Sequence, residues 1–397
     1  MGDGEHQIEV DGIWKVFGNR PERALQEKYL SKSNSEVRDE LGLVVALRDV
    51  SFTVDPGQIF VVMGLSGSGK STLVRCLIRL ILATKGRIRF DGEDILDFSP
   101  EQLMLFRRTK IAMVFQHYAL LPHRRVLDNV AYGLEIRGVD RPDRYKAAEE
   151  AIETVGLKGW EGYYPREMSG GMQQRVGLAR ALAVNPEVLL MDEPFSGLDP
   201  LIRREMQDEL ISLQSELRKT IVFITHDLNE ALKLGDRIAI MRDGGIVQEG
   251  SPDEIVALPR DDYVAEFVRD VSRAKFIQVA SIMKRPSLVL RDEQSPEVAL
   301  QAMRAHGVDK AFLVASDYVF KGIVTANTVN GLVGKAEASL GKAEIVTATT
   351  TDRQTHIEDI IPLAAQTEEP IAVVGDGGRL LGEIDRGTLL EGMSAIR

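Results

Sequence analysis

Residues 59–72 read Ile-Phe-Val-Val-Met-Gly-Leu-Ser-Gly-Ser-Gly-Lys-Ser-Thr, and this stretch decides the fold. The five apolar residues 59–63 predict a buried strand, and the apolar residues after Thr72 predict a helix. The glycine-rich segment Gly64–Thr72 is typical of a phosphate-binding loop, which joins a strand to a helix. Glycines let such a loop turn successive backbone N–H groups toward phosphate oxygens. The sequence therefore predicts a site for a nucleoside triphosphate.

The side chains of this loop have complementary roles. Lys70 supplies a full positive charge for the β- and γ-phosphates, and the Ser71 hydroxyl is placed to bind Mg²⁺. The N-terminal end of the following helix adds a partial positive charge. We expect nucleotide contacts from the residues of the loop other than Leu65, namely Gly64, Ser66, Gly67, Ser68, Gly69, Lys70, Ser71 and Thr72.

The composition indicates a globular protein of two or three domains, because 397 residues exceed one ordinary core. Hydrophobic residues make up 44% of the chain, which is enough for each domain to bury a core. The net charge of −11 disfavours binding of DNA or RNA over a large surface. The one cysteine, Cys76, excludes an intrachain disulfide and fits a reducing cytosol. The polar N-terminus does not resemble a signal peptide, and no apolar run has the length of a membrane span, so we expect any membrane role to come through a partner.

Strands and helices are predicted to alternate over the first two thirds of the chain. Residues 7–17 predict a first strand, residues 19–43 a helical surface insertion, and residues 44–63 two strands around a turn. Further strands or hairpins are expected at 87–92, 111–115, 188–191, 220–225 and 238–247. This alternation favours an α/β fold with a mainly parallel sheet covered by helices.

Polar residues follow three of these strands, where α/β sheets carry their sites. Asp192 is placed to be a second Mg²⁺-associated group, and Glu193 to polarise a water for in-line attack on the γ-phosphate. Gln116 has the reach to contact the metal or this water, and His226 to hydrogen-bond the γ-phosphate. Taken singly, each residue also fits a helix cap or an ordinary hydrogen-bonded polar group. Their joint occurrence after a phosphate-binding loop favours a hydrolytic site.

Two further features leave alternatives open. Ser169, Gly170 and Gly171 begin a helix and are suited to bind the phosphates of a different molecule's nucleotide, or to form a plain serine N-cap. On spacing alone, Phe17 fits a core or edge aromatic better than one that stacks on an adenine ring.

After about residue 270 the pattern changes, and two segments resemble each other. Each has a helix followed by two strands and a second helix, with Phe312 and Ile371 starting equivalent strands at an offset of about 59. An internal duplication is the natural interpretation. The alternative is chance similarity between two such units.

Residues 7–255 resemble the ATP-binding subunit of ABC transporters. In that family Gly64–Thr72 is the Walker A motif, Val188–Glu193 Walker B, Gln116 the Q-loop and His226 the switch histidine. Residues 168–175 match the signature motif, with Met168 in place of leucine, and residues 196–199 match the D-loop, which ends at Asp199. The resemblance also places Phe17 where the family has its adenine-stacking aromatic, which reverses the interpretation from spacing.

The tail, residues 277–334 and 339–395, resembles a tandem pair of CBS domains with an α+β fold. Thr328 and Thr388 stand where nucleotide-binding CBS domains have a ribose-binding aspartate, which disfavours nucleotide binding there. A response to ionic strength or to another ligand stays open. The whole arrangement, with an ABC domain over residues 1–270, is similar to the ATPase of glycine betaine/proline betaine importers.

This resemblance implies a head-to-tail homodimer in which Walker A of one copy and Ser169 of the other enclose each ATP with Mg²⁺. It also implies a membrane permease as partner, an external (periplasmic or extracellular) substrate-binding protein, and a place on the cytoplasmic face of the inner (plasma) membrane. Alternatives are import of another small solute such as choline or an amino acid, and a soluble ABC ATPase without a transport role. Soluble ABC ATPases usually carry a long coiled-coil insertion or two ATPase cassettes in one chain. This sequence has neither feature, which disfavours the second alternative.

Overall fold

The computed structural model describes residues 6–115, 119–269, 277–335 and 339–394. The chain divides into two compact units, Met1–Arg269 and Asp270–Arg397, and each is described by itself. None of the helices within the described residues combines the length and the apolarity that crossing a bilayer requires.

The first unit is built on a six-stranded sheet with the strand order β10-β9-β3-β8-β7-β6. All neighbouring strands run parallel except β9 and β10, which form a hairpin. This arrangement confirms the predicted α/β fold with a mainly parallel sheet. The strands are β3 (Ile59–Met63), β6 (Ile111–Val114), β7 (Val188–Asp192), β8 (Thr220–Thr225), β9 (Arg237–Arg242) and β10 (Gly245–Gly250).

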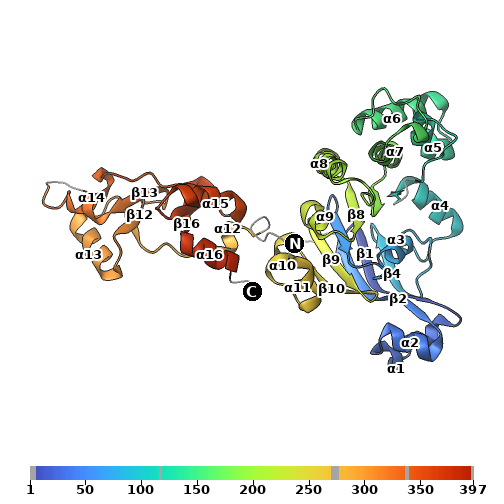
Figure 1. Cartoon of the computed structure of the whole chain (residues 1–397), viewed down its shortest axis with the longest axis horizontal. Helices are drawn as coiled ribbons and strands as arrows, with labels where there is room; N and C mark the ends of the chain where they lie inside the picture. Colours follow the sequence, from blue (N-terminus) through green and yellow to red (C-terminus); the bar gives the residue numbers. More distant parts are fainter. Residues whose placement is uncertain (1–5, 116–118, 270–276, 336–338, 395–397) are drawn as a thin grey trace. The chain divides into compact units, whose positions relative to one another are not determined.

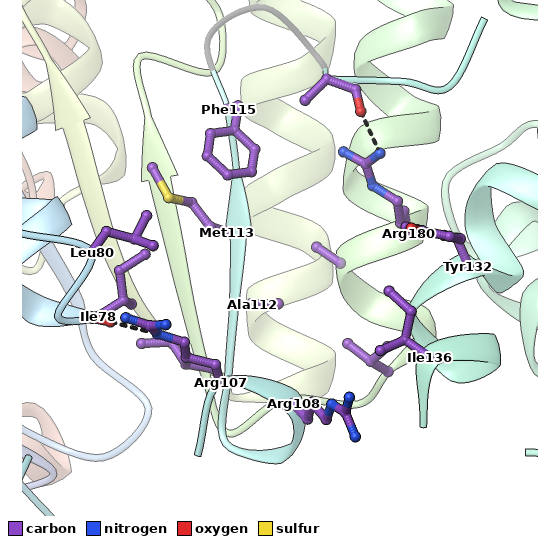
Figure 2. Close-up of a pocket in the computed structure, with 15 residues that line it drawn as sticks. Ile78, Leu80, Arg107, Arg108, Ala112, Met113, Phe115, Tyr132, Ile136 and Arg180 are labelled. Atoms are coloured by element: carbon purple, nitrogen blue, oxygen red, sulfur yellow. Dashed lines mark hydrogen bonds between the residues drawn. The ribbon is translucent and has the colours of Figure 1, made fainter. Parts of the chain in front are cut away.

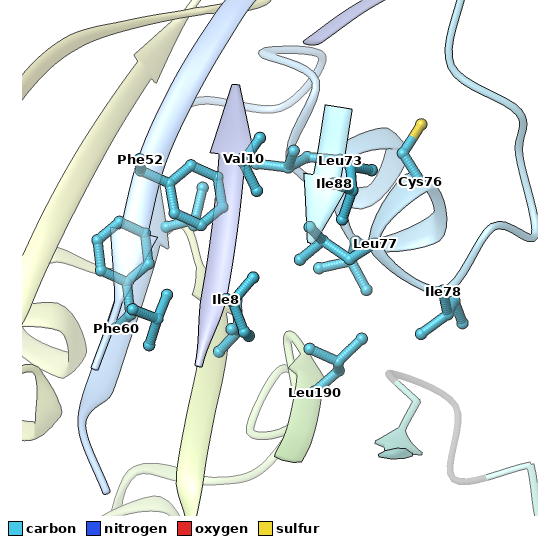
Figure 3. Close-up of a cluster of buried hydrophobic side chains, with 14 of the residues drawn as sticks. Ile8, Val10, Phe52, Phe60, Leu73, Cys76, Leu77, Ile78, Ile88 and Leu190 are labelled. Carbon is cyan, nitrogen blue, oxygen red and sulfur yellow. The ribbon is translucent and has the colours of Figure 1, made fainter. Parts of the chain in front are cut away.

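A second, antiparallel sheet covers one side of this unit, with the order β2-β1-β4-β5. Its strands are β1 (Ile8–Phe17), β2 (Val44–Val54), β4 (Lys85–Phe90) and β5 (Glu93–Asp94). Figure 3 shows the core where its apolar face meets the phosphate-loop helix α3 (Lys70–Leu77) and the parallel sheet. The rings of Phe52 and Phe60 stack there, with centroids 4.7 Å apart and planes 8° from parallel.

Helices cover the first unit on several sides (Figure 1). α5 (Val126–Ile136), α6 (Arg141–Thr154) and α7 (Gly170–Ala183) pack against one another as a helical layer. The remaining helices are α4 (Pro100–Thr109), α8 (Pro200–Leu217), α9 (Leu228–Leu234), α10 (Pro252–Ala257) and α11 (Asp262–Val268), with a 3₁₀ turn at Pro165–Glu167.

The segment between β1 and β2 is helical and has a small core of its own. It contains a 3₁₀ helix (Pro21–Leu25), α1 (Glu27–Leu30) and α2 (Asn34–Leu41). α2 begins with a capping box between Ser33 and Glu36 and ends at Gly42 in the left-handed conformation. Tyr29 and Val37 are buried there against Trp14.

The second unit contains two copies of a β-α-β-β-α arrangement, and this confirms the tandem α+β pair. The first copy comprises β11 (Val289–Arg291), α13 (Pro296–His306), β12 (Lys310–Val314), β13 (Phe320–Thr325) and α14 (Ala326–Asn330). The second comprises β14 (Thr350–Asp352), α15 (Ile357–Gln366), β15 (Ile371–Val374), β16 (Leu380–Ile384) and α16 (Arg386–Ser394). Leu313 faces Gly322 in one sheet and Val373 faces Gly382 in the other, so equivalent positions are about 60 residues apart.

The two copies exchange their leading segments. Ile277 and Val279, the latter at the start of α12 (Val279–Ile282), are buried in the core of the second copy. Leu340 and Ala343 are in turn buried in the core of the first copy. Each copy therefore completes its core with residues that precede the other copy.

Phe52→Ala is expected to lower the free energy of unfolding of the first unit by about 3–5 kcal/mol, because it removes a buried ring and leaves a cavity. Val44→Ala on the same strand is the control, since Val44 is 52% exposed and its truncation should change stability by less than about 0.5 kcal/mol. The measurement is urea unfolding followed by tryptophan fluorescence, because both tryptophans, Trp14 and Trp160, lie in the first unit. Equal midpoints for the two variants would contradict the importance of the stacked pair.

Candidate functional site

The parallel register of the sheet brings three predicted segments to one edge. Met63, the last residue of β3, pairs with Thr225 at the end of β8. Asp192 at the end of β7 pairs with Ile224. Since the carboxyl ends of parallel strands meet at the same edge, the phosphate-binding loop, Asp192–Glu193 and His226 leave the sheet side by side.

The backbone of the phosphate-binding loop requires glycine at two positions. Gly64 has φ +151°, and a Cβ there would lie 2.3 Å from the Met241 carbonyl oxygen. Gly69 has φ +105°, and a Cβ there would lie 2.5 Å from the Ala46 carbonyl oxygen. Neighbouring backbone therefore packs against the loop where side chains are absent, and this close approach fixes its curvature.

Lys70 lies at the centre of this loop. Its ammonium donates to the carbonyl oxygens of Gly64, at 2.7 Å, and Leu65, at 3.0 Å. The residue is only 4% exposed, and burial lowers the pKa of its ammonium, with Glu193 and Asp192 opposing the shift. The loop thus encloses a desolvated positive charge, which is suited to an anionic ligand.

The loop also holds a buried hydroxyl that is not used within the fold. Ser68 Oγ is buried and has no hydrogen-bond partner within the described part of the chain. Buried polar groups are nearly always paired, so this hydroxyl fits a contact with a bound phosphate. Ser66 and Gly67 beside it are exposed, and Thr72 is half-buried in the first turn of α3.

Ser71 and Asp192 form a second polar pair at the base of the loop. The Ser71 hydroxyl donates to Asp192 Oδ1 at 3.1 Å. Burial raises the pKa of the Asp192 carboxyl above its usual range, although the hydrogen bond from Ser71 favours the charged form. A hydroxyl and a carboxylate are hard oxygen donors of the kind Mg²⁺ prefers when it keeps waters and phosphate oxygens as its other ligands. Groups of three or more acidic, histidine or cysteine ligands are not found among the described residues, so these two donors fit a shared site completed by a nucleotide.

Glu193 has a strained backbone at this edge. Its φ is +45°, which is uncommon for a residue with a side chain and is typical of functional sites. Its N–H donates to the Ile224 carbonyl oxygen at 3.0 Å, which extends the pairing of β7 with β8 by one residue. The Glu193 carboxylate lies 3.1 Å from His226 Nδ1. Glu193 is 18% exposed and His226 58%, so the pair joins a mostly buried carboxylate to an accessible imidazole.

The remaining predicted residues lie in other parts of the first unit. Ser169 is the N-cap of α7, where its Oγ accepts from the Met172 N–H at 3.3 Å. Ser169 and Gly170 are nevertheless exposed, whereas Gly171 is buried, and a Cβ there would lie 2.5 Å from Ile202 Cγ2.

Phe17 lies at the end of its strand, as predicted, and Asp199 lies at the start of a helix. Asp199 caps α8, with Oδ1 accepting from two backbone N–H groups at 3.1 Å. Phe17, the last residue of β1, is 40% exposed, and the Lys15 ammonium lies 4.8 Å from its ring centroid. Gln116 lies outside the described residues.

A groove beside this edge was not predicted from the sequence. Figure 2 shows it between β6 and α4 on one side and the helical layer on the other. It has a volume of about 420 Å³, and its apolar lining includes Met113, Phe115 and Ile136. The Arg180 guanidinium at its wall donates to the Ala119 carbonyl oxygen at 2.6 Å. The lining residues come from segments far apart in sequence, and the one local signal was Phe115, the aromatic residue that follows β6.

Cys76 takes no part in the site. It is fully buried on α3, and burial raises the pKa of its thiol to about 11. A thiol with so high a pKa is a weak nucleophile at neutral pH.

Comparison with protein families identifies both units. Residues 47–196 match the ABC transporter family, and residues 279–332 match the CBS domain family. The dimeric structure of a bacterial ABC transporter cassette superposes with a TM-score of 0.53 at 30% identity, covering 62% of this chain and 98% of that chain. A post-hydrolysis state of that cassette, bound to ADP and Pi, gives a TM-score of 0.52 at 30% identity over the same shares of the two chains.

Three curated relatives cover most of the chain. The glycine betaine/carnitine transport ATP-binding protein of Listeria monocytogenes is 46% identical over 388 residues, 98% of this chain and 98% of the relative. The glycine betaine transport ATP-binding protein of Bacillus subtilis is 46% identical over 386 residues, 97% of this chain and 91% of the relative. The trimethylamine N-oxide transport system ATP-binding protein of Ruegeria pomeroyi is 52% identical over 286 residues, 72% of this chain and 84% of the relative.

Asp192→Asn is expected to raise the free energy of unfolding of the nucleotide-free chain by about 0.5–2 kcal/mol at neutral pH. Burial raises the pKa of Asp192 in the folded state, so the ionised carboxylate destabilises the fold above that raised pKa. Asparagine cannot ionise but still accepts the hydrogen bond from Ser71. The gain should shrink as the pH falls through the raised pKa and vanish below the ordinary pKa of an aspartate.

Urea unfolding of both proteins at neutral and acidic pH measures this difference. Asp97→Asn, at an exposed carboxylate, is the control and should leave the unfolding midpoint unchanged. A destabilised Asp192→Asn variant at neutral pH would refute the predicted cost of this buried charge.

Proposed function

This chain belongs to the ATP-binding subunits of glycine betaine ABC importers, and from that premise we propose how its residues perform the activity. The protein is an ATPase that couples ATP binding and hydrolysis to the import of a quaternary-amine osmoprotectant through a separate membrane permease. Its CBS tail is regulatory. The observation that best supports the residue roles is the convergence of Lys70, Ser71, Asp192 and Glu193 at one edge of the sheet.

We assign nucleotide binding to the phosphate-binding loop. The backbone N–H groups of residues 64–72 and the Lys70 ammonium hold the β- and γ-phosphates, and Ser68 Oγ gains a partner. Ser71 and Asp192 would hold Mg²⁺, and Gln116 would complete its contacts. When bound, the ion neutralises charge on the β- and γ-phosphate oxygens. The exposed face of Phe17 would stack on the adenine ring.

Hydrolysis is assigned to Glu193 and His226. The Glu193 carboxylate accepts a proton from the attacking water, and His226 holds that carboxylate and hydrogen-bonds the γ-phosphate. The strained backbone of Glu193, held by the bond to Ile224, fixes the direction of its side chain without help from the ligand.

ABC ATPase cassettes act as dimers, and we propose a head-to-tail homodimer for this chain. The exposed N-terminal end of α7, with Ser169 and Gly170, would close on the nucleotide held by the loop of the second copy. Gly171 lets α7 pack closely on α8, and Asp199 presents the loop before α8 to the same interface. ATP binding then closes the pair, and hydrolysis opens it.

The permease is proposed to dock in the groove shown in Figure 2. The groove is apolar, open and next to the strand that leads to Gln116, so a segment inserted there would respond to the nucleotide site. Three arginines, Arg107, Arg108 and Arg180, surround it and favour a segment with an acidic or carbonyl-rich end.

The other partners and the location follow from this assembly. We propose an external binding protein, periplasmic or extracellular, that delivers the solute, and a peripheral position of this chain on the cytoplasmic face of the inner (plasma) membrane. We further propose domain limits of 1–270 for the ATPase, and 277–334 and 339–395 for the two CBS domains. Glycine betaine or proline betaine is the proposed solute.

Glu193→Gln is expected to lower ATP turnover by about 10²–10⁴-fold while ATP binding and ATP-dependent dimerisation persist, because the amide cannot accept the proton of the attacking water. Steady-state phosphate release and analytical ultracentrifugation with ATP measure the two effects. Glu216→Gln, at an exposed carboxylate near the end of α8, is the matched control and should keep normal turnover. Undiminished turnover in the Glu193 variant would remove this residue from its proposed role.

Ile136→Lys is expected to weaken association with the permease by about tenfold or more, because it places an unpaired charge in an apolar groove among arginines. Co-purification of the tagged chain with its permease, together with uptake of radiolabelled glycine betaine at high osmolarity, measures the loss. Leu258→Lys adds the same charge at an exposed leucine outside the groove and should have no effect. Normal co-purification of the Ile136 variant would place the permease elsewhere.

A further inference from the structure

A buried hydrogen-bond network lies directly behind His226, between α8 and α9. Thr225 Oγ1 donates to Glu230 Oε2 at 2.6 Å, and Gln207 Nε2 donates to Glu230 Oε1 at 3.2 Å. Thr225 Oγ1 also accepts from the Asp227 N–H at 2.9 Å. One buried carboxyl group therefore fixes the backbone on both sides of His226.

Arg203 connects this network to the loop that precedes α8. Its Nη1 donates to Asp227 Oδ2 at 3.3 Å, and its Nη2 donates to the Leu198 carbonyl oxygen at 3.4 Å. Its Nε lies 3.8 Å from Glu230 Oε1. Leu198 is the residue before Asp199, so a single guanidinium reaches from the loop 196–199 to the residue after His226.

The charges in this network depend on one another. The Glu230 side chain is only 7% exposed, and burial raises the pKa of its carboxyl. A buried carboxylate is costly unless it is paired, and Arg203 is the cation beside it. The rigid fork of a guanidinium can contact several acceptors at fixed angles, which a lysine ammonium on a flexible stem cannot do. Arg203 Nε is buried without a hydrogen-bond partner among the described residues. The guanidinium therefore has this N–H available for a closer contact with Glu230.

We propose that Arg203 is a positioning residue that couples the loop 196–199 to His226, with Glu230 as its buried counterpart. The proposal rests on the proposed function, because that loop is the part placed against the second copy. Closure of the second copy moves the Leu198 carbonyl and with it the guanidinium. Through Asp227 and Glu230 this movement turns the His226 imidazole, which already lies 3.1 Å from the Glu193 carboxylate, toward the γ-phosphate. Arg203 acts on the nucleotide only through His226.

Arg203→Met in the full-length chain, assembled with its permease, tests this proposal. We expect kcat to fall about 10–100-fold with the KM for ATP little changed. A displacement of the His226 imidazole by about 1 Å would slow the chemical step but would hardly affect the binding of ATP. Cooperativity between the two ATP sites should also fall, with a Hill coefficient approaching one. In a His226→Ala background the same substitution should cause no additional loss, because a residue that acts through His226 has nothing left to position.

Two variants separate positioning from a structural role. Asp208→Asn removes the exposed ion pair with Lys233, 2.6 Å long, which also joins α8 to α9 but touches neither loop. It should keep wild-type turnover. Arg203→Lys keeps the charge and is the second test should the methionine variant fail to fold; it should lose about 3–10-fold in kcat, again without effect in the His226→Ala background.

The outcomes distinguish this inference from the function on which it rests. An additive loss in the His226→Ala background, or an equal loss in Asp208→Asn, would overturn the role of Arg203. Failure of the wild-type complex to hydrolyse ATP, or normal hydrolysis by Glu193→Gln, would instead contradict the proposed function.

Discussion

The parallel register between β3, β8 and β7 is the constraint on which the site depends. It places Met63 beside Thr225 and Asp192 beside Ile224, so that segments about 130 and 160 residues apart in the chain leave the sheet at one level. A shift of one strand by one residue would turn all of its side chains to the opposite faces of the sheet. The same register buries Lys70 and Asp192 together, which lowers the pKa of the first and raises that of the second. Burying these two charged groups lowers the stability of the fold, but it gives the sheet a polar edge that suits phosphate and a divalent cation.

Local patterns were sufficient for the parts of the chain whose chemistry lies in contiguous residues. The loop Gly64–Thr72 can be recognised in the sequence by its glycines. The structure requires glycine there, because neighbouring backbone atoms lie too close for a side chain. The strand ends at Asp192 and His226 follow from apolar runs that stop at a polar residue. The duplication in the tail is also visible in the sequence, which predicts an offset of about 59, and the paired strands place equivalent positions about 60 residues apart. The roles of Phe17 and Asp199, by contrast, depended on the family resemblance.

The rest depends on contacts between distant segments, which periodicity cannot specify. Alternation predicted β1 and β2 but not that they join β4 in a separate antiparallel sheet, with β1 between the other two, because a strand pattern does not identify its partner. Arg203 and Glu230 looked like ordinary charged residues of two helices. Their proposed role depends on the packing of α8 against α9, which brings the Arg203 guanidinium within hydrogen-bond distance of Leu198 and Asp227.

The exchange of leading segments in the second unit bears on how such a tail arises. Ile277 and Val279 are buried in the second copy, and Leu340 and Ala343 in the first. A solitary copy would expose this apolar segment to water, and could cover it only by swapping it with another chain. The tandem therefore resembles a swapped dimer whose two chains have been joined by gene duplication and fusion. Because each core contains residues that precede the other copy, we expect the two halves to unfold in one cooperative transition.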